Sequence, residues 1–449
     1  MFKKVLIANR GEIAMRVLRC CQEMGIDTVT ACSSEDRNSL PVQFSTESVC
    51  IGPAQAAASY LNQEALIEAA KAYHCDAIHP GYGFLSENAD FAEKCEKNGI
   101  TFIGPSSRMI REMGDKQSAR ALMKKHGVPV VPGSDGILKD WKEAAEVAAK
   151  VGYPVLVKAT AGGGGRGMRT AFDESEIRSA FESAEAEARA AFGDGSLYLE
   201  TLILHPHHSE VQILGDTKGN IIQLGERDCS MQRRNQKLME ECPARILNSR
   251  QREAIHKAAL KAARAVHYVS AGTVEFVLDR ENHFYFIEMN TRIQVEHPVT
   301  EEVTGVDLIR EQLRIAAGLS LGYKQSDIHL NGHAIECRIN AENPDKGFMP
   351  CPGTITALHL PGGKGIRIDS AMYSGCEIPP YYDSMIAKLI VWGKTRDEAI
   401  RKMKSALDEV IIEGVCTNVD YQYDILDHPD FAAGKTDIEF IERFSREEQ

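Results

Sequence analysis

The segment Glu288–Pro298 constrains this chain more than any other part of its sequence. Its first nine residues hold two carboxylates, two amides and an arginine, groups that proteins rarely bury without partners. These polar residues are Glu288, Asn290, Arg292, Gln294 and Glu296. Few structural needs would bring them together, so the segment indicates a site for a metal and an anion.

The residues around this segment predict a β-hairpin. Gly272–Leu278 and His283–Asn290 read as two strands joined by a polar turn, which sets Glu275 nearly opposite Glu288. Because side chains alternate along a strand, we expect Glu288 and Asn290 on one face. The opposite face is then expected to carry Tyr285, Ile287 and Met289.

Glu275, Glu288 and Asn290 offer only oxygen ligands, which suit Mg²⁺ or Mn²⁺ bridging nucleotide phosphates better than zinc. The alternative is a polar stripe that faces solvent.

Composition limits the class of protein. A chain of 449 residues predicts roughly three domains, and its net charge of −12 argues against nucleic acid or an anionic membrane as the main partner. Twelve cysteines without zinc-like spacing fit reduced thiols in a cytoplasmic protein. No targeting segment and no apolar run of about 18 residues are present, so no membrane span is expected.

The first 114 residues alternate strands with helices, which is typical of a doubly wound, Rossmann-like α/β domain. The expected strands are Lys4–Ala8, Thr28–Cys32, Ala77–His79 and Thr101–Ile103, and the expected helices are Glu12–Met24, Asn62–Tyr73 and Asn88–Asn98. The first turn holds a single glycine, so a dinucleotide site is not expected.

Two glycine-rich turns are candidate ligand loops. The first, His79–Asn88, includes Tyr82 and follows a strand, where parallel sheets place ligands; the alternative is a plain turn in which Ser86 caps the next helix. The second follows the strand Pro154–Lys158, and its consecutive glycines would let main-chain N–H groups reach phosphate oxygens. This second loop is not a Walker A loop. Ordering four consecutive glycines costs conformational entropy, which suits a mobile lid better than a rigid cradle. The alternative is a flexible linker.

Three motifs in this order resemble those of the biotin carboxylases of the ATP-grasp superfamily. They are the glycine run 162–168, the stretch Glu226–Arg234 and the segment Glu288–Glu301. The likeness begins at Ile7 and continues to Lys388, so it covers essentially the whole chain.

The resemblance implies a two-step reaction. ATP and bicarbonate give carboxyphosphate and ADP, and carbon dioxide then passes to N1′ of biotin on a carrier protein. Two Mg²⁺ or Mn²⁺ ions are expected with ATP. The residues implied to contact the nucleotide are Lys116, Lys158, Gly164, Gly165, Glu200, Thr201, Leu202, Ile203, His208, Gln232 and Asn235.

The resemblance also assigns the reacting centre. The bicarbonate pocket would be Lys237, Arg292, Gln294 and the Val295 amide, with Glu296 as the base and Tyr82 on the substrate side. Arg338 resembles the residue that stabilises the biotin enolate; taken alone, a strand-face salt bridge with Glu336 would explain it as well.

The sequence departs from the family pattern at three positions. Asn235 stands where a histidine is usual, Ala161 replaces the first of five glycines, and Thr201 replaces a commonly basic hinge residue. Asn235 puts nucleotide affinity in question, but none of the three removes a catalytic group.

The implied domains are a Rossmann-like part (1–114), an ATP-grasp part of α+β type (115–330, with a glycine-rich lid at about 132–203) and a biotin carboxylase C-terminal part (331–449). Thr395–Glu398 reads as a capping box, which places Met403 and Lys404 inside a helix rather than in a biotinyl hairpin. Biotin is therefore expected on a separate biotin carboxyl carrier protein.

The favoured function is the biotin carboxylase subunit of a multisubunit acetyl-CoA carboxylase, which supplies malonyl-CoA for fatty acid synthesis. Its expected partners are the carrier, the carboxyltransferase subunits and, by analogy, a second copy of the chain as a homodimer. The alternatives are an ATP-grasp ligase with another acceptor, the same subunit of a pyruvate or propionyl-CoA carboxylase, and a non-catalytic ATP-binding scaffold.

Overall fold

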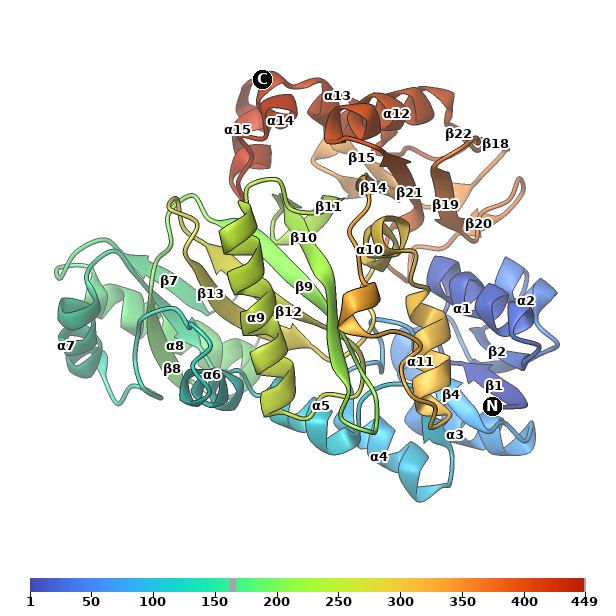
Figure 1. The fold of residues 1–449 in the computed structure, drawn as a ribbon, viewed down its shortest axis with the longest axis horizontal. Helices are drawn as coiled ribbons and strands as arrows, with labels where there is room; N and C mark the ends of the chain where they lie inside the picture. The colour runs from blue at the N-terminus through green and yellow to red at the C-terminus, as the bar shows by residue number, and fades with distance from the viewer. Residues whose placement is uncertain (161–166, 448–449) are drawn as a thin grey trace.

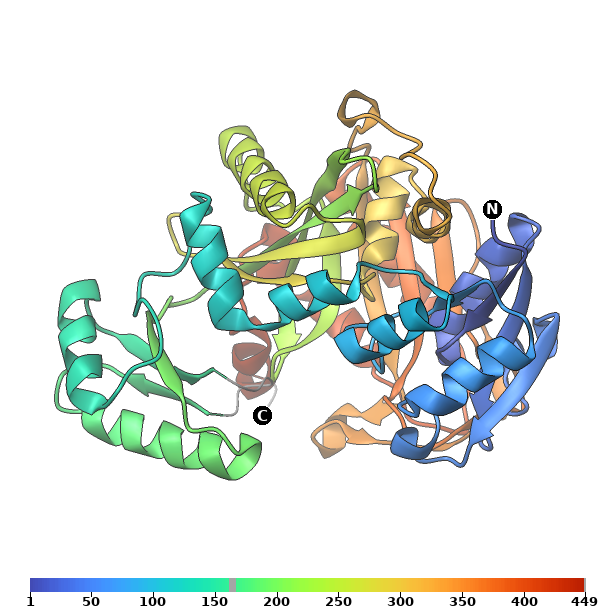
Figure 2. The ribbon, with the colours of Figure 1, turned by 90° about the horizontal axis from the view of Figure 1, so that it is seen from below.

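The computed structural model describes residues 1–160 and 167–447, and it confirms the predicted mixed α/β fold (Figure 1). A parallel sheet lies at one side of the molecule, a long antiparallel sheet runs through the middle, and a three-stranded sheet lies at the opposite side (Figure 2). No helix in the described ranges has the length and apolar character needed to cross a membrane.

The N-terminal sheet is all-parallel, in the order β3-β2-β1-β4-β5. Its strands are β1 (Lys4–Ile7), β2 (Asp27–Ser33), β3 (Glu47–Gly52), β4 (Ala77–His79) and β5 (Thr101–Phe102). The helices are α1 (Gly11–Glu23), α2 (Leu40–Phe44), α3 (Gln63–Ala72), α4 (Ala89–Lys97) and α5 (Ser107–Gly114), with a 3₁₀ turn at Ala56–Ala58. All the predicted elements are present. Strand β3 escaped prediction because only Ile51 in it is buried, which leaves no apolar pattern to read.

The loops after β1 and β4 meet because these two strands are neighbours at the point where the strand order reverses. The Asn9 side chain donates hydrogen bonds to the carbonyls of Pro80 and Tyr82, both at 2.7 Å. Gly81 has φ +61°, and a Cβ there would lie 2.9 Å from the Asn9 amide nitrogen. Glycine is thus required for this close approach.

The central sheet has eight strands in the order β13-β12-β9-β10-β11-β14-β21-β19. Their bounds are β9 (His207–Gly215), β10 (Ile221–Arg233), β11 (Gln236–Cys242), β12 (Ser270–Leu278), β13 (Phe284–Asn290), β14 (His333–Asn340), β19 (Ile366–Ser370) and β21 (Met385–Gly393). The helices beside it are α6 (Lys116–Lys125), α9 (Ser249–Ala265), α10 (His297–Thr304) and α11 (Leu308–Ala316), with a 3₁₀ turn at Gln325–Asp327.

This sheet crosses the expected domain boundary near residue 330. Strand β11 pairs with β14 from Met239↔Cys337 to Cys242↔Ala334, so the central and C-terminal parts share one continuous ladder. The boundary itself stays a prediction.

The three-stranded sheet, in the order β7-β6-β8, forms a separate layer with its own core. Its elements are α7 (Trp141–Val151), β6 (Val155–Ala159), β7 (Met168–Ala171), α8 (Ile177–Phe192) and β8 (Leu197–Thr201). Leu138, Val155, Val157, Phe181 and Leu199 lie in this core. Two isolated bridges, Gly133↔Glu200 and Leu138↔Leu197, extend the sheet toward the connector from α6.

The C-terminal region packs helices and short strands against β14 and β21. The helices are α12 (Arg396–Glu409), α13 (Val419–Asp427), α14 (Pro429–Ala433) and α15 (Phe440–Glu447), with a 3₁₀ turn at Pro344–Lys346. The short strands are β15 (Glu342–Asn343), β16 (Met349–Pro350), β17 (Gly353–Thr354), β18 (Ala357–His359), β20 (Glu377–Ile378) and β22 (Ile411–Glu413).

Helix α12 starts where the sequence predicts, and Met403 is buried within it. Only half of the expected capping box forms. Thr395 accepts a hydrogen bond from the Glu398 N–H, but the Glu398 carboxylate accepts from the Lys394 N–H instead of returning to Thr395.

Candidate active site

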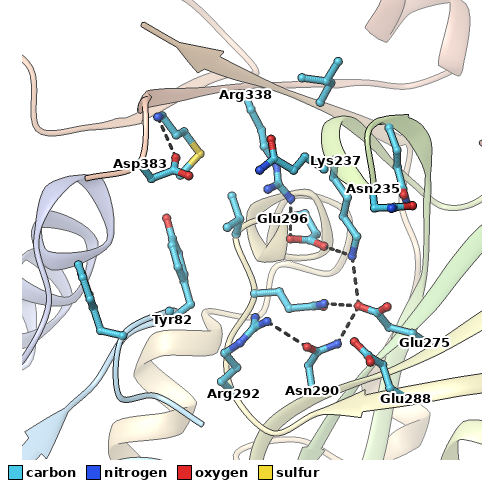
Figure 3. Close-up of a pocket in the computed structure, with 18 of the residues that line it drawn as sticks. Tyr82, Asn235, Lys237, Glu275, Glu288, Asn290, Arg292, Glu296, Arg338 and Asp383 are labelled. Atoms are coloured by element: carbon cyan, nitrogen blue, oxygen red, sulfur yellow. Dashed lines mark hydrogen bonds and ion pairs between the residues drawn. The ribbon is translucent and has the colours of Figure 1, made fainter. Parts of the chain in front are cut away.

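A cavity of about 930 Å³ lies where the three parts of the chain meet. The loops after β1 and β4, the central sheet and the C-terminal strands all contribute to its wall. Figure 3 shows its polar side chains converging from these separate elements. Its lining includes Tyr82, Lys116, Lys158, His208, Gln232, Asn235, Lys237, Glu275, Glu288, Asn290, Arg292, Gln294, Val295, Glu296 and Arg338.

The hairpin β12–β13 carries the predicted oxygen ligands. Glu275 and Glu288 are register partners, as expected, and Asn290 Nδ2 donates to Glu275 Oε1 at 2.7 Å. The ammonium group of Lys116 lies 3.3 Å from Glu288 Oε2. Glu275, Glu288 and Asn290 thus line one cavity (Figure 3).

The strict alternation expected for β13 is wrong. The register passes from Glu275↔Glu288 to Phe276↔Phe286, so Ile287 forms a bulge. Phe286 and Met289 pack in the core, whereas Ile287 lines the cavity beside Glu288. The extra residue moves the side chains that precede it in β13 to the opposite face of the sheet. A prediction that assumes strict alternation of side chains cannot anticipate this change.

The donor chemistry at this hairpin fits a hard divalent cation. Burial acts to raise the pKa of Glu275, but the nearby Lys237 and His208 outweigh it, so this pKa is lowered and the carboxylate stays ionised. Two carboxylates and an amide oxygen are the ligand types that Mg²⁺ and Mn²⁺ prefer.

A row of alternating charges runs from this hairpin toward β14. Lys237 Nζ lies 2.7 Å from Glu210, 3.3 Å from Glu275 and 2.6 Å from Glu296. Arg338 Nη2 lies 3.1 Å from the other oxygen of Glu296. The structure thus brings together Lys237, Glu296 and Arg338, which the family resemblance implies for the reacting centre.

The Glu296 carboxylate is almost wholly buried, which acts to raise its pKa. The positive charges of Lys237 and Arg338 outweigh this effect of burial, so the pKa of Glu296 is lowered. The side chain is therefore held in its proton-accepting form.

Arg338 does not form the strand-face salt bridge with Glu336 that was the alternative explanation for it. Its guanidinium bonds Glu240 on the neighbouring strand, with Nε donating to Oε1 at 2.7 Å, and it reaches Glu296. Within the described part of the chain, neither carboxylate oxygen of Glu336 has a hydrogen-bond partner. Arg338 thus faces the cavity, as a substrate-contacting role requires.

Arg292 is positioned by a residue that the sequence analysis did not assign. Its Nε donates to Glu87 Oε2 at 2.8 Å, and its Nη2 donates to Asn290 Oδ1 at 3.0 Å. Glu87 also accepts from the Thr291 N–H. The helix after this turn is capped by Asn88 rather than by Ser86, the residue that the plain-turn alternative proposed, which leaves Glu87 outside the helix.

Gln294 and Val295 lie in a buried polar network under the site. Gln294 Nε2 donates to Glu275 at 2.8 Å, and its oxygen accepts from the wholly buried Arg227 at 2.6 Å. Arg227 also pairs with Glu210 at 2.6 Å. Lys388 Nζ donates to the Val295 carbonyl at 2.9 Å. Sequence reasoning missed Arg227, Glu210 and Lys388, although Arg227 lies within the Glu226–Arg234 motif.

The expected nucleotide residues are partly brought together. Lys116, Lys158, His208, Gln232 and Asn235 line the cavity. Lys158 Nζ lies 2.9 Å from Glu200, and Gln232 Nε2 lies 3.0 Å from His208 Nδ1.

The four hinge residues are not among those that line the cavity: Glu200, Thr201, Leu202 and Ile203. The main-chain N–H groups of Thr201 and Leu202 already bond the carbonyls of Pro132 and Pro154. Gly164 and Gly165 lie outside the described residues.

Tyr82 enters the cavity from the N-terminal glycine turn (Figure 3). Its hydroxyl donates to the buried carboxylate of Glu12. Burial and the Glu12 charge raise the pKa of Tyr82 well above its ordinary value, so its hydroxyl remains a donor. The cavity therefore offers cations for an anion, an ionised carboxylate as base and oxygen ligands for a metal.

Family models match three successive parts of the chain. Residues 1–110 match the biotin carboxylase N-terminal domain, residues 115–324 the ATP-binding domain of the carbamoyl-phosphate synthase L chain, and residues 336–443 the biotin carboxylase C-terminal domain.

Individual relatives match over nearly the full length. Biotin carboxylase 1 of Bacillus subtilis is 55% identical over 445 residues, which cover 99% of each chain. The crystal structure of a Campylobacter jejuni biotin carboxylase–β-γ-ATP complex is 50% identical, with a TM-score of 0.95 and 99% of each chain covered. The biotin carboxylase domain dimer of Hydrogenobacter thermophilus 2-oxoglutarate carboxylase, with MgADP, ADP and bicarbonate, is 52% identical, with a TM-score of 0.93 and coverage of 99% of this chain and 98% of that one.

Proposed function

We propose that this chain, which belongs to the biotin carboxylase family, carboxylates biotin with ATP and bicarbonate as the first half-reaction of an acetyl-CoA carboxylase. The observation that carries the proposal is the position of Glu296. Its ionised carboxylate lies between Lys237 and Arg338, in the same cavity as the oxygen ligands of β12 and β13. A base between two cations is suited to deprotonate a bound anion.

In the first step, Glu296 takes the proton of bicarbonate while a bicarbonate oxygen attacks the γ-phosphorus of ATP. A new O–P bond forms, the bond from the γ-phosphorus to the bridging oxygen breaks, and ADP leaves. Arg292, Lys237, Gln294 and the Val295 amide hold the bicarbonate. Arg292 has a planar fork that matches a planar oxyanion, and Glu87 holds that fork at the cavity wall.

Glu275, Glu288 and Asn290 would hold Mg²⁺ or Mn²⁺, with two ions per ATP. Bound there, the metal neutralises phosphate charge and polarises the transferring group. Lys116, 3.3 Å from Glu288, and Lys158 line the same cavity and would add positive charge toward the phosphates. His208, Gln232 and Asn235 also line the cavity and would face the nucleotide.

In the second step, the C–O bond of carboxyphosphate breaks and gives carbon dioxide and phosphate. N1′ of biotin loses its proton to the released phosphate and attacks the carbon of carbon dioxide, which forms the new N–C bond. Negative charge then develops on the ureido oxygen of biotin. Arg338 is oriented by Glu240 toward the cavity and would stabilise that charge, while Tyr82 lines the same cavity with its hydroxyl hydrogen held by Glu12.

The proposed partners are a biotin carboxyl carrier protein and carboxyltransferase subunits. A homodimer is proposed from the Hydrogenobacter thermophilus relative, which is described as a dimer. The twelve free cysteines fit a reducing compartment such as the cytoplasm.

A second candidate is the same half-reaction within another biotin-dependent carboxylase. The 2-oxoglutarate carboxylase domain is 52% identical, close to the 55% of the Bacillus subtilis relative. The residues proposed here would contact ATP, bicarbonate and biotin, which such enzymes share, so the choice between them lies in the carboxyltransferase.

The deciding assay measures ADP release by the full chain with MgATP. We expect release to depend on bicarbonate and to rise with free biotin. Release that ignores bicarbonate would instead indicate an ATP-grasp ligase with another acceptor. Reconstitution with the carrier and carboxyltransferase of an acetyl-CoA carboxylase should then yield malonyl-CoA. Turnover only with a 2-oxoglutarate or pyruvate carboxyltransferase would select the second candidate.

A further inference from the structure

Two cysteines that lie 65 positions apart in the sequence meet at the surface of the C-terminal region. The Cys416 N–H donates to the sulfur of Cys351 at 3.1 Å, and the Asn343 amide donates to the sulfur of Cys416 at 3.7 Å. Cys351 is half-buried and Cys416 is exposed. We call these two residues the thiol pair.

The backbone around the thiol pair is already held together. Strands β18 and β22 pair from Ala357↔Glu413 to His359↔Ile411, and the Thr356 N–H continues the pairing to the Glu413 carbonyl. A Cβ on Gly414 would lie 2.1 Å from the Thr354 carbonyl oxygen, so the two segments are in direct contact. A bond between the two sulfurs therefore requires little backbone movement.

The thiol pair differs from the other cysteines of the chain. Nine of the twelve are buried, and burial raises the pKa of thiols such as Cys229, Cys242 and Cys337, which makes them unreactive. The pKa of Cys416 is raised as well, by the adjacent Cys351 thiol rather than by burial, so exposure and not acidity distinguishes the thiol pair. The thiol pair thus lies together at a place that solvent and small oxidants reach.

We propose that the thiol pair is a modification site at which hydrogen peroxide forms a disulfide. One thiolate attacks a peroxide oxygen, the O–O bond breaks and hydroxide leaves, which gives a sulfenic acid. The second thiol loses its proton and attacks that sulfur, the S–S bond forms and water leaves. The two sulfurs are oxidised, and one peroxide is reduced to two waters.

The disulfide would fasten the segment that supports the substrate side of the cavity. Asn418 lies two residues after Cys416 and is wholly buried. Its side chain accepts from the Asn340 N–H at 2.7 Å and donates to the Arg338 carbonyl at 3.0 Å. Because the bond joins segments that are already paired, it should stabilise this support without displacing it.

The test treats the reduced full chain with a small excess of hydrogen peroxide. Mass spectrometry should find a peptide that links Cys351 to Cys416, with the buried thiols still reduced. The oxidised chain should melt higher than the reduced chain by roughly 4 °C or more, and a thiol reductant should reverse the shift.

Three variants make the result specific. Cys351→Ser and Cys416→Ser should each lose both the link and the oxidation-dependent rise in Tm. Cys50→Ser, which removes an exposed thiol elsewhere, should keep both. Separate oxidation of Cys351 and Cys416 without a link would overturn the proposal, and so would a linked chain that melts no higher than the reduced one.

Discussion

At the scale of single residues, the site is a series of alternating charges in which each charged group shifts the pKa of its neighbours. Glu296 forms ion pairs with both Lys237 and Arg338, so its pKa is lowered and its carboxylate would be a ready but weak base in the proposed reaction. Anionic substrates would compete for the same two cations, which would free the carboxylate as they bind. In the proposed reaction, the basicity of Glu296 would thus depend on substrate binding through these two ion pairs.

The substitution Glu296→Gln tests this division of labour. The amide cannot take a proton, so kcat for bicarbonate-dependent ADP release should fall by about 100-fold or more, while the Kd for ATP stays within about threefold. Steady-state kinetics and ATP binding by calorimetry measure the two effects. Glu253→Gln, on the exposed face of α9, is the control. Equal losses of turnover and ATP binding would show that Glu296 does not act as the base.

At the scale of elements, two adjacent residues of strand β11 have different roles: one positions an active-site side chain, and the other stabilises the fold. Glu240 is wholly buried and holds Arg338, which lines the cavity, and burial raises the pKa of Glu240 to about 7. Glu241 points the other way and accepts hydrogen bonds from His333 at 2.8 Å and Arg396 at 2.6 Å. Burial alone would raise the pKa of Glu241, but these two partners lower it to about 2. Because side chains alternate along the strand, Glu240 contacts an active-site residue on one face, whereas Glu241 accepts stabilising hydrogen bonds on the other.

Glu241→Gln should lower the free energy of unfolding, and the loss should depend on pH. The pKa of Glu241 is lowered by folding, so its contribution is complete above its ordinary pKa of 4.5 and declines as pH falls toward 2. We expect a loss of about 3 kcal/mol at pH 7, smaller by roughly 1 kcal/mol at pH 3.5. Urea unfolding at both pH values measures it, with the exposed Glu413→Gln as control. A loss that is constant across this range would contradict the assignment.

At the scale of the whole molecule, Lys388 joins parts that are far apart in the sequence. Its side chain is fully buried on β21, and its ammonium lies 3.1 Å from Glu12 on α1 and 3.8 Å from Asp369 on β19. It also donates to the carbonyl of Val295, one of the residues proposed to hold bicarbonate. The N-terminal and C-terminal parts thus hold the active-site loop between them.

Replacing this lysine by methionine would leave the buried Glu12 carboxylate without its cation. Lys388→Met should therefore lower the free energy of unfolding by about 3–5 kcal/mol. Denaturant unfolding measures it, and Lys394→Met, on the exposed residue just after β21, should change little. A loss below about 1 kcal/mol would mean that Lys388 is not the electrostatic link between the parts.

Elements that carry a local pattern could be predicted from the sequence. The alternation of strands and helices in the N-terminal part, the hairpin that pairs Glu275 with Glu288 and the start of α12 are all present in the structure. Strand β3 and the bulge at Ile287 were missed, because an exposed edge strand has no apolar period and a bulge breaks the period of two.

The sequence by itself determined which chemical groups the site contains, because motif residues such as Arg292 and Glu296 lie close together along the chain. Only the tertiary structure decided their partners. Glu87, Lys388 and Glu240 come from three other segments, and their pairing depends on burial and sheet order rather than on neighbouring residues. The physical reason is that a buried charge needs a countercharge within a few ångströms, and folding alone brings that countercharge from a distant part of the chain.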